Sequence, residues 1–399
     1  MSSLFPDSAR PYSIIPVLLL FLCAAPGTLR AQDVTLVPGL ALRQEYNDNV
    51  AATTVDRRSD YITALSPSLS LSHQSETAQA TATGGVNALY YLEGAKSDSI
   101  GYFLKGIGSY ATTPLVILSA DLSYVKDNSA STLDLATGKV IGSRAEHGNY
   151  RAGVRREISE VSAATLDVTY GRDAYANPGY YDLTHWEADA ALQYRLEGVL
   201  PKFVLAPQAG FRRDHTSLSQ VDTLSGQLVS SFALNELWSL NLAAGVHYTS
   251  SEFDDPFGPR TRHDETGGLG KAVLSYSGER ASGNLSLSHA LAPAAGTSGT
   301  ARVTAGRLTL YRRFTDALSG TVAGSYSWSW SAEKQFSAQA VDERSKNFTA
   351  SLLYGIPDRR DLTLEARYSY HTTDYHRTGA EMDQNVVMLQ LTWRHEMFR

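Results

Sequence analysis

The sequence predicts an all-β protein, namely a transmembrane antiparallel up-and-down β-barrel of about eighteen strands, with sixteen as the alternative count. Three observations lead to this fold class. Many segments alternate apolar and polar side chains residue by residue, and the connections between them alternate between short and long. No apolar run after residue 31 reaches the roughly twenty residues of a membrane-spanning helix, so a chain that crosses a membrane would cross it as strands.

Residues 361–371 illustrate the alternation, which is cleaner still in residues 318–330. One face of this segment carries Leu362, Leu364, Ala366, Tyr368 and Tyr370. The other face carries Thr363, Glu365, Arg367, Ser369 and His371. Residues 318–330 repeat the pattern over a longer stretch than a small soluble sandwich usually needs.

The N-terminal segment predicts export. Arg10 precedes an apolar run over residues 14–22, and small or polar residues follow as far as Ala31. This order is typical of a secretory signal peptide, which we place at residues 1–31, with the barrel at 32–399. A retained anchor helix is the alternative. Cys23 is the one cysteine of the chain and lies inside this segment, so the exported chain would have no thiol or disulfide chemistry.

Eighteen segments show the alternation. The predicted strands cover residues 34–47, 60–72, 77–92, 99–110, 115–125, 147–156, 161–172, 185–196, 202–212, 221–233, 238–249, 266–276, 282–289, 301–312, 318–330, 347–355, 362–371 and 385–395.

The connections carry an independent signal. Eight of them have four to six residues, whereas residues 48–59, 126–146, 173–184, 250–265, 331–346 and 372–384 form longer ones. Bacterial outer-membrane barrels have short periplasmic turns and longer external loops, and an even strand number puts both termini on one side. Two loops, 126–146 and 253–264, are candidates for folding inward and narrowing the lumen.

Aromatic residues favour a membrane barrel over a pair of soluble sandwiches or a propeller. Many tyrosines and tryptophans fall on the apolar face near strand ends, where rings prefer the lipid headgroup boundary. Examples are Tyr90, Tyr102, Tyr124, Tyr170, Trp186, Tyr194, Trp238, Tyr248, Tyr276, Tyr354 and Tyr370.

Two segments resemble a known family. Residues 38–50 contain a Tyr-x-Asp-Asn element, and residues 60–72 contain a Ser-Pro-x-Leu-Ser-Leu run. Both are similar to elements of the outer-membrane β-barrel porins found beside exopolysaccharide or exosortase genes. The matching residues are Tyr46, Asp48, Asn49, Ser66, Pro67, Leu69, Ser70 and Leu71. The resemblance implies a barrel in a secretion or envelope context and names no transported molecule.

The polar face of the predicted strands would line the lumen. Its cations are Arg43, Lys105, Arg151, Arg155, Arg195, Arg212, Lys271, Arg367 and Arg394. Its anions are Glu45, Asp121, Asp167, Glu187, Asp189 and Glu365. This wall has a surplus of cations although the whole chain carries a formal net charge of -6. A surplus of wall charge biases which ions enter a pore, so we expect a mild preference for an anionic solute or glycan. The alternative is that these charges pair across neighbouring strands and only solvate the lumen.

The predicted function is therefore a water-filled pore in the outer membrane of a Gram-negative cell, either a diffusion porin or the exit conduit of an exopolysaccharide. Expected partners are outer-membrane lipid and the barrel assembly machinery. Two other classes stay open: a surface adhesin or structural barrel with a blocked lumen, and a barrel hydrolase using acid and histidine pairs such as Asp214-His215 or His263-Asp264.

Other classes lack a signal. Phosphate-loop and HExxH motifs are absent, so no cofactor, catalytic residue or structural metal is predicted. No basic patch indicates nucleic acid. Glu252, Asp254 and Asp255 are the one acidic group that could hold a divalent cation at the cell surface.

Overall fold

The chain folds into a closed β-barrel in a computed structural model that describes residues 34–397 except 95–97, 135, 197, 199–201, 255–258, 294–295 and 360. The expected signal peptide lies outside the described residues. The barrel strands are β1 Val34–Asn47, β2 Asp60–Gln74, β3 Ala78–Tyr91, β4 Ser99–Thr113, β5 Val116–Asp127, β8 Ala145–Ser159, β9 Ser162–Tyr175, β10 Leu183–Arg195, β11 Val204–His215, β12 Ser219–Ala233, β13 Trp238–Phe253, β14 Thr261–Ser277, β15 Ala281–Pro293, β16 Thr300–Arg313, β17 Leu318–Ser331, β18 Val341–Gly355, β19 Leu362–Tyr375 and β20 Ala380–Arg394.

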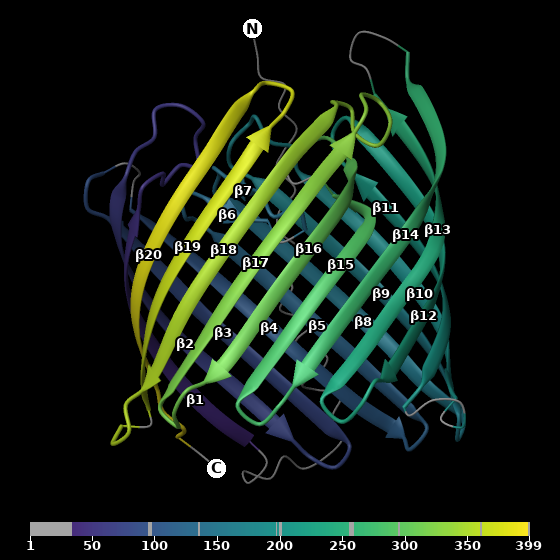
Figure 1. Cartoon of the computed structure of the whole chain (residues 1–399), viewed down its shortest axis with the longest axis horizontal. Coiled ribbons are helices and arrows are strands. Elements are labelled where there is room, and N and C mark those ends of the chain that lie inside the picture. The colour runs from purple at the N-terminus through teal and green to yellow at the C-terminus, as the bar shows by residue number, and fades with distance from the viewer. Residues whose placement is uncertain are drawn as a thin grey trace, which may run out of the picture.

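Every barrel strand pairs antiparallel with its neighbours in the chain, and the first strand pairs with the last. The closing seam runs from Gly39 opposite Arg394 to Asn47 opposite Val386. The strands are steeply inclined to the barrel axis, as closure of a sheet requires (Figure 1). The eighteen-strand, antiparallel prediction is confirmed.

The two faces of the wall differ as the alternation predicts. Leu42 is 50% exposed on one face of β1, while Arg43 points to the other. Val246 is 67% exposed on the outer face of β13. The outer face therefore presents apolar side chains to its surroundings, and the inner face presents polar ones. Among the described residues no helix is long and apolar enough to cross a membrane.

The strand ends at the loop side differ from the prediction. β14 begins at Thr261 and β18 at Val341, so residues 176–182, 254–260, 332–340 and 376–379 form shorter connections than expected. These strand ends are polar on both faces, for example in the run Arg262-His263-Asp264-Glu265. Polar ends give no apolar phase to detect, although their backbones continue the antiparallel ladder.

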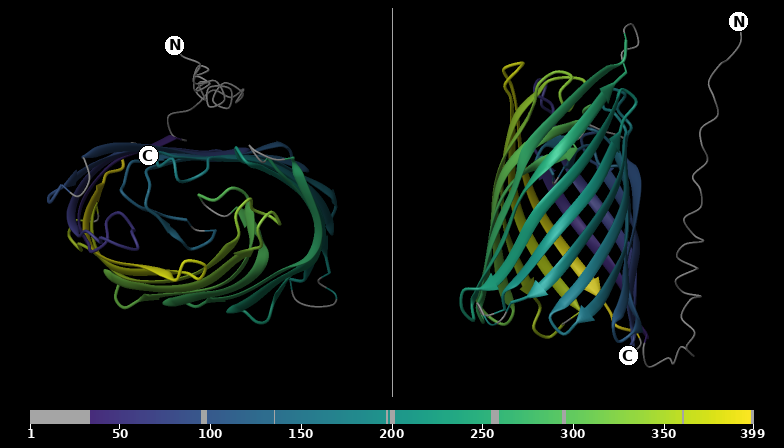
Figure 2. Two further views of the ribbon diagram at one scale, coloured as in Figure 1. Left: turned by 90° about the horizontal axis from the view of Figure 1, so that it is seen from above. Right: turned by 90° about the vertical axis from the view of Figure 1, so that its right-hand side faces the viewer.

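Several connecting segments lie inside the barrel. Viewed from above, the barrel is elliptical and two groups of loops project into its interior (Figure 2, left). One of them includes a two-stranded hairpin, β6 Thr132–Leu133 with β7 Val140–Ile141. The buried apolar residues accordingly sit within the lumen, where Val50, Ile62, Ala64, Leu89, Tyr91 and Ala130 form one cluster.

Candidate functional site

The candidate site is the lumen and the loops that narrow it. The register places the charged residues predicted for the lumen on the inner face. Arg151 lies opposite Asp121, Asp189 opposite Asp167, and Arg212 opposite Glu187. The other predicted residues, Arg43, Glu45, Lys105, Arg155, Arg195, Lys271, Glu365, Arg367 and Arg394, have the same phase in their strands.

Many of these charges pair with a close neighbour. Arg151 Nε lies 3.0 Å from Asp167 Oδ1. Arg367 lies 2.6 Å from Glu365. Such pairs neutralise part of the wall and leave its side chains solvated, which is the alternative stated above.

Sequence reasoning missed further inward charges. The register adds Arg307 and Arg313 on β16 and seven acids, Asp60, Asp127, Glu157, Asp173, Asp214, Glu265 and Glu343. Most of them lie just beyond the predicted strand ends, whereas Arg307 and Asp60 lie within predicted strands 301–312 and 60–72 and were not counted. Because seven of the nine additions are acids, they offset the expected surplus of cations.

The loop between β5 and β8 crosses the lumen. Its tip reaches the opposite wall, where the backbone carbonyl of Gly138 accepts a hydrogen bond of 2.9 Å from Asn347 of β18. The carbonyl of Thr137 accepts another from the hydroxyl of Ser327 on β17. Gln384 of β20 lies 3.2 Å from the hydroxyl of Ser131 near the base of the loop. The inward fold predicted for residues 126–146 is confirmed, and we call residues 128–144 the crossing loop.

One ion pair joins the tip of the crossing loop to the wall. Lys139 Nζ lies 2.8 Å from Glu343 Oε1, and the two side chains are only 7% and 16% exposed. The ammonium also lies 4.9 Å from the centre of the Tyr375 ring. Burial, the largest single influence, would lower the pKa of Lys139, but the Glu343 carboxylate together with Tyr375 and Tyr180 outweighs it and holds that pKa above its ordinary value. The lysine therefore stays charged inside the barrel.

The sequence contains a local signal for this hairpin. Leu133 and the pair Val140-Ile141 are apolar and flank a turn, in which Gly138 has a φ of 70°, a value that favours glycine. Nothing in the sequence shows which wall the tip contacts.

A second inward segment occupies the other end of the ellipse. Residues 332–340 connect β17 and β18, and Phe336 within them is fully buried. Its ring lies 6.5 Å from the His247 ring of β13. The backbone N–H of Thr300 donates to the carbonyl of Phe336 over 2.8 Å. In the other inward candidate, residues 253–264, Phe253 ends β13 and residues 261–264 begin β14, while 255–258 lie outside the described residues.

The Tyr-x-Asp-Asn element closes the barrel. Asp48 accepts hydrogen bonds from the backbone and side chain of Asn385, at 2.6 and 2.7 Å. The side-chain amide of Asn49 donates to the carbonyl of Asp383 over 2.8 Å. Both contacts join the end of β1 to β20. The Tyr46 ring, on the outer face, lies 5.0 Å from the Tyr61 ring.

The Ser-Pro run interrupts a ladder. The register of β2 with β3 passes from Leu65 to Ser68, so Ser66 and Pro67 have no partner in β3. Proline has no N–H to donate, which accounts for the break. The residues of both motif segments are therefore accounted for by their hydrogen bonds and backbone pairing in the barrel wall.

The structure does not bring together an acid and histidine site at the predicted pairs. Asp214 is buried beside Arg212 on the inner face, whereas its neighbour His215 has the opposite phase in β11. His263 Nε2 lies 3.4 Å from Glu265, and Asp264 points to the other face. Within the described residues no cluster of three or more His, Cys, Asp or Glu side chains could hold a metal.

The acidic group at the rim binds a cation of its own chain. Arg260 lies 2.7 Å from Asp254 and 3.3 Å from Glu252. Asp255 lies outside the described residues.

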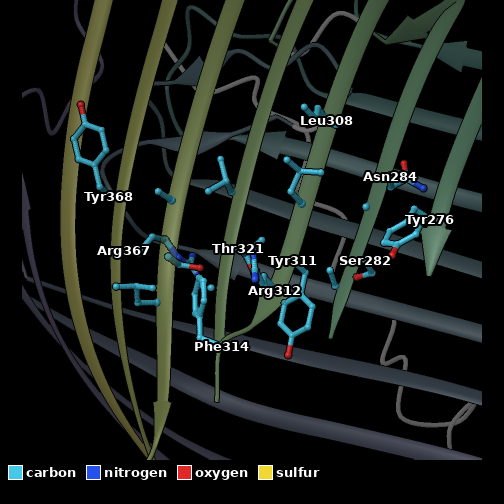
Figure 3. Close-up of a pocket in the computed structure, with 18 of the residues that line it drawn as sticks. Tyr276, Ser282, Asn284, Leu308, Tyr311, Arg312, Phe314, Thr321, Arg367 and Tyr368 are labelled. Carbon is cyan, nitrogen blue, oxygen red and sulfur yellow. The ribbon is translucent and has the colours of Figure 1, made fainter. Parts of the chain in front are cut away.

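The outer face also has a hollow of about 950 Å³. Its lining comes mainly from outward-facing residues of β13–β20, including Leu308, Tyr276 and Tyr368 (Figure 3). Because this lining is apolar, the hollow suits hydrocarbon rather than a hydrophilic solute.

Comparisons with known proteins add the following. No protein family model matches the chain, and no curated protein matches it in sequence. Solved structures that it resembles include OccAB3 of Acinetobacter baumannii, with 10% identity, a TM-score of 0.47, and coverage of 92% of this chain and 100% of that chain. OccK2 (OpdF) of Pseudomonas aeruginosa has 11% identity, a TM-score of 0.49, and coverage of 92% and 98%. A structure of OccK2 in complex with glucuronate has 9% identity, a TM-score of 0.47, and coverage of 92% and 99%. These values leave the function to be argued from the residues of this chain.

Proposed function

We propose that the protein is an outer-membrane pore through which hydrophilic solutes diffuse along a hydrated lumen. The observation that carries the proposal is the contrast between the two faces of the closed wall. Apolar residues such as Leu42, Leu224 and Val246 are exposed on the outer face, while charged and hydroxyl side chains line the inner face. Exposure of so much apolar surface to water would be costly, whereas lipid accommodates it.

Aromatic contacts on the outer face support the same placement. Tyr170 lies 4.6 Å from Trp186, near the loop end of the strands. Trp238 lies 4.9 Å from Tyr276, near the turn end. Rings at two levels, with aliphatic side chains between them, match the two headgroup boundaries of a bilayer.

The crossing loop sets the size of the opening in this proposal. Strand numbers of sixteen to eighteen leave an aqueous channel unless something fills it. The crossing loop and residues 332–340 both occupy that space, so passage is restricted to solutes that fit between them.

The charge balance of the wall bears on selectivity. Since the added acids offset the surplus of cations, the proposed anion preference is weak. The resemblance of residues 46–49 and 66–71 to exopolysaccharide-associated barrels is the one observation that favours a glycan as the solute.

Swelling of liposomes that contain the purified mature protein tests the pore. Swelling should be fast with small neutral sugars and should slow as sugar size increases. A protein that gives no swelling with any sugar would instead be a barrel with a blocked lumen.

Reversal potentials in a salt gradient measure ion selectivity, and strong cation selectivity would contradict the anion preference. Block of the conductance by an acidic oligosaccharide would support a glycan.

A further inference from the structure

The wall is split at one seam. β14 pairs with β15 from Gly270 opposite His289 to Ser277 opposite Ser282. Both strands continue beyond His289 and Gly270, β15 as far as Pro293 and β14 back to Thr261. In the described part of the chain no ladder pair joins Thr261–Leu269 to β15, although β13 pairs with β14 along its whole length. Figure 1 shows β13 and β14 rising beyond their neighbours at the upper right.

Side chains alone close this split, and they converge on one carboxylate. Glu265 of β14 accepts hydrogen bonds from Arg302 of β16 and from Gln335 of the 332–340 segment. Arg302 also lies 5.7 Å from the centre of the Trp330 ring. A cavity of about 380 Å³ lies at this place, lined by residues that include His263, Glu265, Trp330 and Gln335.

The outer side of the split is uncovered at Gly268. This residue has the outward phase of β14, opposite Val246 of β13, and no heavy atom lies within 4 Å of the place that its Cβ would take. An unpaired strand edge is costly in hydrocarbon because its N–H and C=O groups have no partner there. An opening in a barrel wall is therefore tolerated only where water or polar side chains reach it.

We propose that this seam is a lateral window, through which amphipathic molecules pass between the lumen and the outer leaflet of the membrane. The polar side of such a molecule would meet Glu265 and Gln335, and its apolar side would leave past the Trp330 ring. The two contacts of Glu265, with Arg302 and with Gln335, hold the window closed. The inference rests on the proposed function only for the placement of the barrel in the membrane.

The test compares uptake of the apolar dye N-phenylnaphthylamine by cells that carry each variant in an otherwise intact outer membrane. Glu265→Ala removes both contacts of the seal, so dye uptake should rise several-fold over the natural protein. Asp222→Ala is the matched control, because Asp222 binds Arg213 over 2.7 Å on a seam whose ladder is continuous. The control should leave dye uptake unchanged.

A second variant is the conservative one. Glu265→Gln keeps a side-chain oxygen that can accept from Arg302 and Gln335, so its dye uptake should stay at the level of the natural protein. Equal uptake in Glu265→Ala and Asp222→Ala would overturn the window, as would equal uptake in Glu265→Gln and Glu265→Ala.

Folding and pore activity are measured on the same samples. The shift in gel mobility on boiling reports the folded barrel, and Gln335→Ala, which removes one contact only, replaces Glu265→Ala if that variant does not fold. Liposome swelling with a neutral disaccharide should stay unchanged in all variants. A dye response without any swelling would refute the pore and leave the window standing; swelling without a dye response would do the reverse.

Discussion

At the scale of single residues, Asn49 fixes the closing seam. It is fully buried, and its side-chain amide donates to the carbonyls of Thr53 and Asp383 over 2.8 Å each. Asn49→Ala leaves these carbonyls unpaired, so we expect a loss of about 1–3 kcal/mol in the free energy of unfolding. The urea midpoint of the folded band on unboiled gels measures it. Asn284→Ala removes an exposed contact with Ser275 and should change stability by less than about 0.5 kcal/mol; equal losses would contradict the seam role.

Lys139 is the second residue with a predictable effect. Lys139→Ala leaves the Glu343 carboxylate largely buried and without its partner. Breaking such a pair lowers the free energy of unfolding by about 3–5 kcal/mol. We expect the crossing loop to detach from the wall and single-channel conductance to rise. Lys126→Ala is the control, since Lys126 pairs with Glu146 on the exposed outer rim. An unchanged conductance in Lys139→Ala would mean that the loop does not limit the opening.

The same ion pair predicts a pH dependence. Because the pKa of Lys139 is raised in the folded state, the stabilisation by the pair is fully present below the ordinary lysine pKa of about 10.4. It is lost only as the pH rises through the higher folded value. Lys139 should therefore contribute no change in conductance between about pH 7 and about pH 9, and a Lys139-dependent step in that interval would contradict the assignment.

At the scale of strands, the two faces of one element should respond oppositely to the same substitution. Leu242 of β13 points outward, and its neighbour Asn241 points inward. Leu242→Arg places a charge against hydrocarbon and should cost up to about 2–4 kcal/mol, depending on depth. Asn241→Arg should be tolerated in a hydrated lumen. Urea unfolding in lipid vesicles measures both, and equal costs would indicate a water-soluble sheet protein.

The strands were predictable from the sequence, whereas the wall residues that the inward loops contact were not. Alternation such as that in residues 318–330 follows from a wall with one apolar and one polar face, so a short stretch of sequence is enough to reveal it. The contact of Lys139 with Glu343 joins residues 204 positions apart, and no local pattern encodes it. The separation of β14 from β15 also cannot be detected in the sequence, because Thr266-Gly267-Gly268-Leu269 is as compatible with a paired strand as with an unpaired one.

At the scale of the whole molecule, the net charge and the lumen charge are separate quantities. The inward phase predicted from sequence omitted Glu343 and Glu265 because their strands were taken to start later than they do. An error of a few residues in where these strands begin therefore changed the expected ion selectivity, while the predicted fold class was unaffected. Wall charge depends on a few residues at strand ends, whereas barrel closure depends on the pattern of the entire chain.

The elliptical outline has a mechanical consequence. The crossing loop is anchored in β5 and β8 at its base and bonded to β17 and β18 at its tip, so it spans the interior from one side to the other (Figure 2). A hollow cylinder with such an internal strut resists being rounded or squeezed by changes in lateral pressure of the surrounding bilayer. Severing the strut would let the cross-section relax, and the stiffness of the whole shell would fall with it.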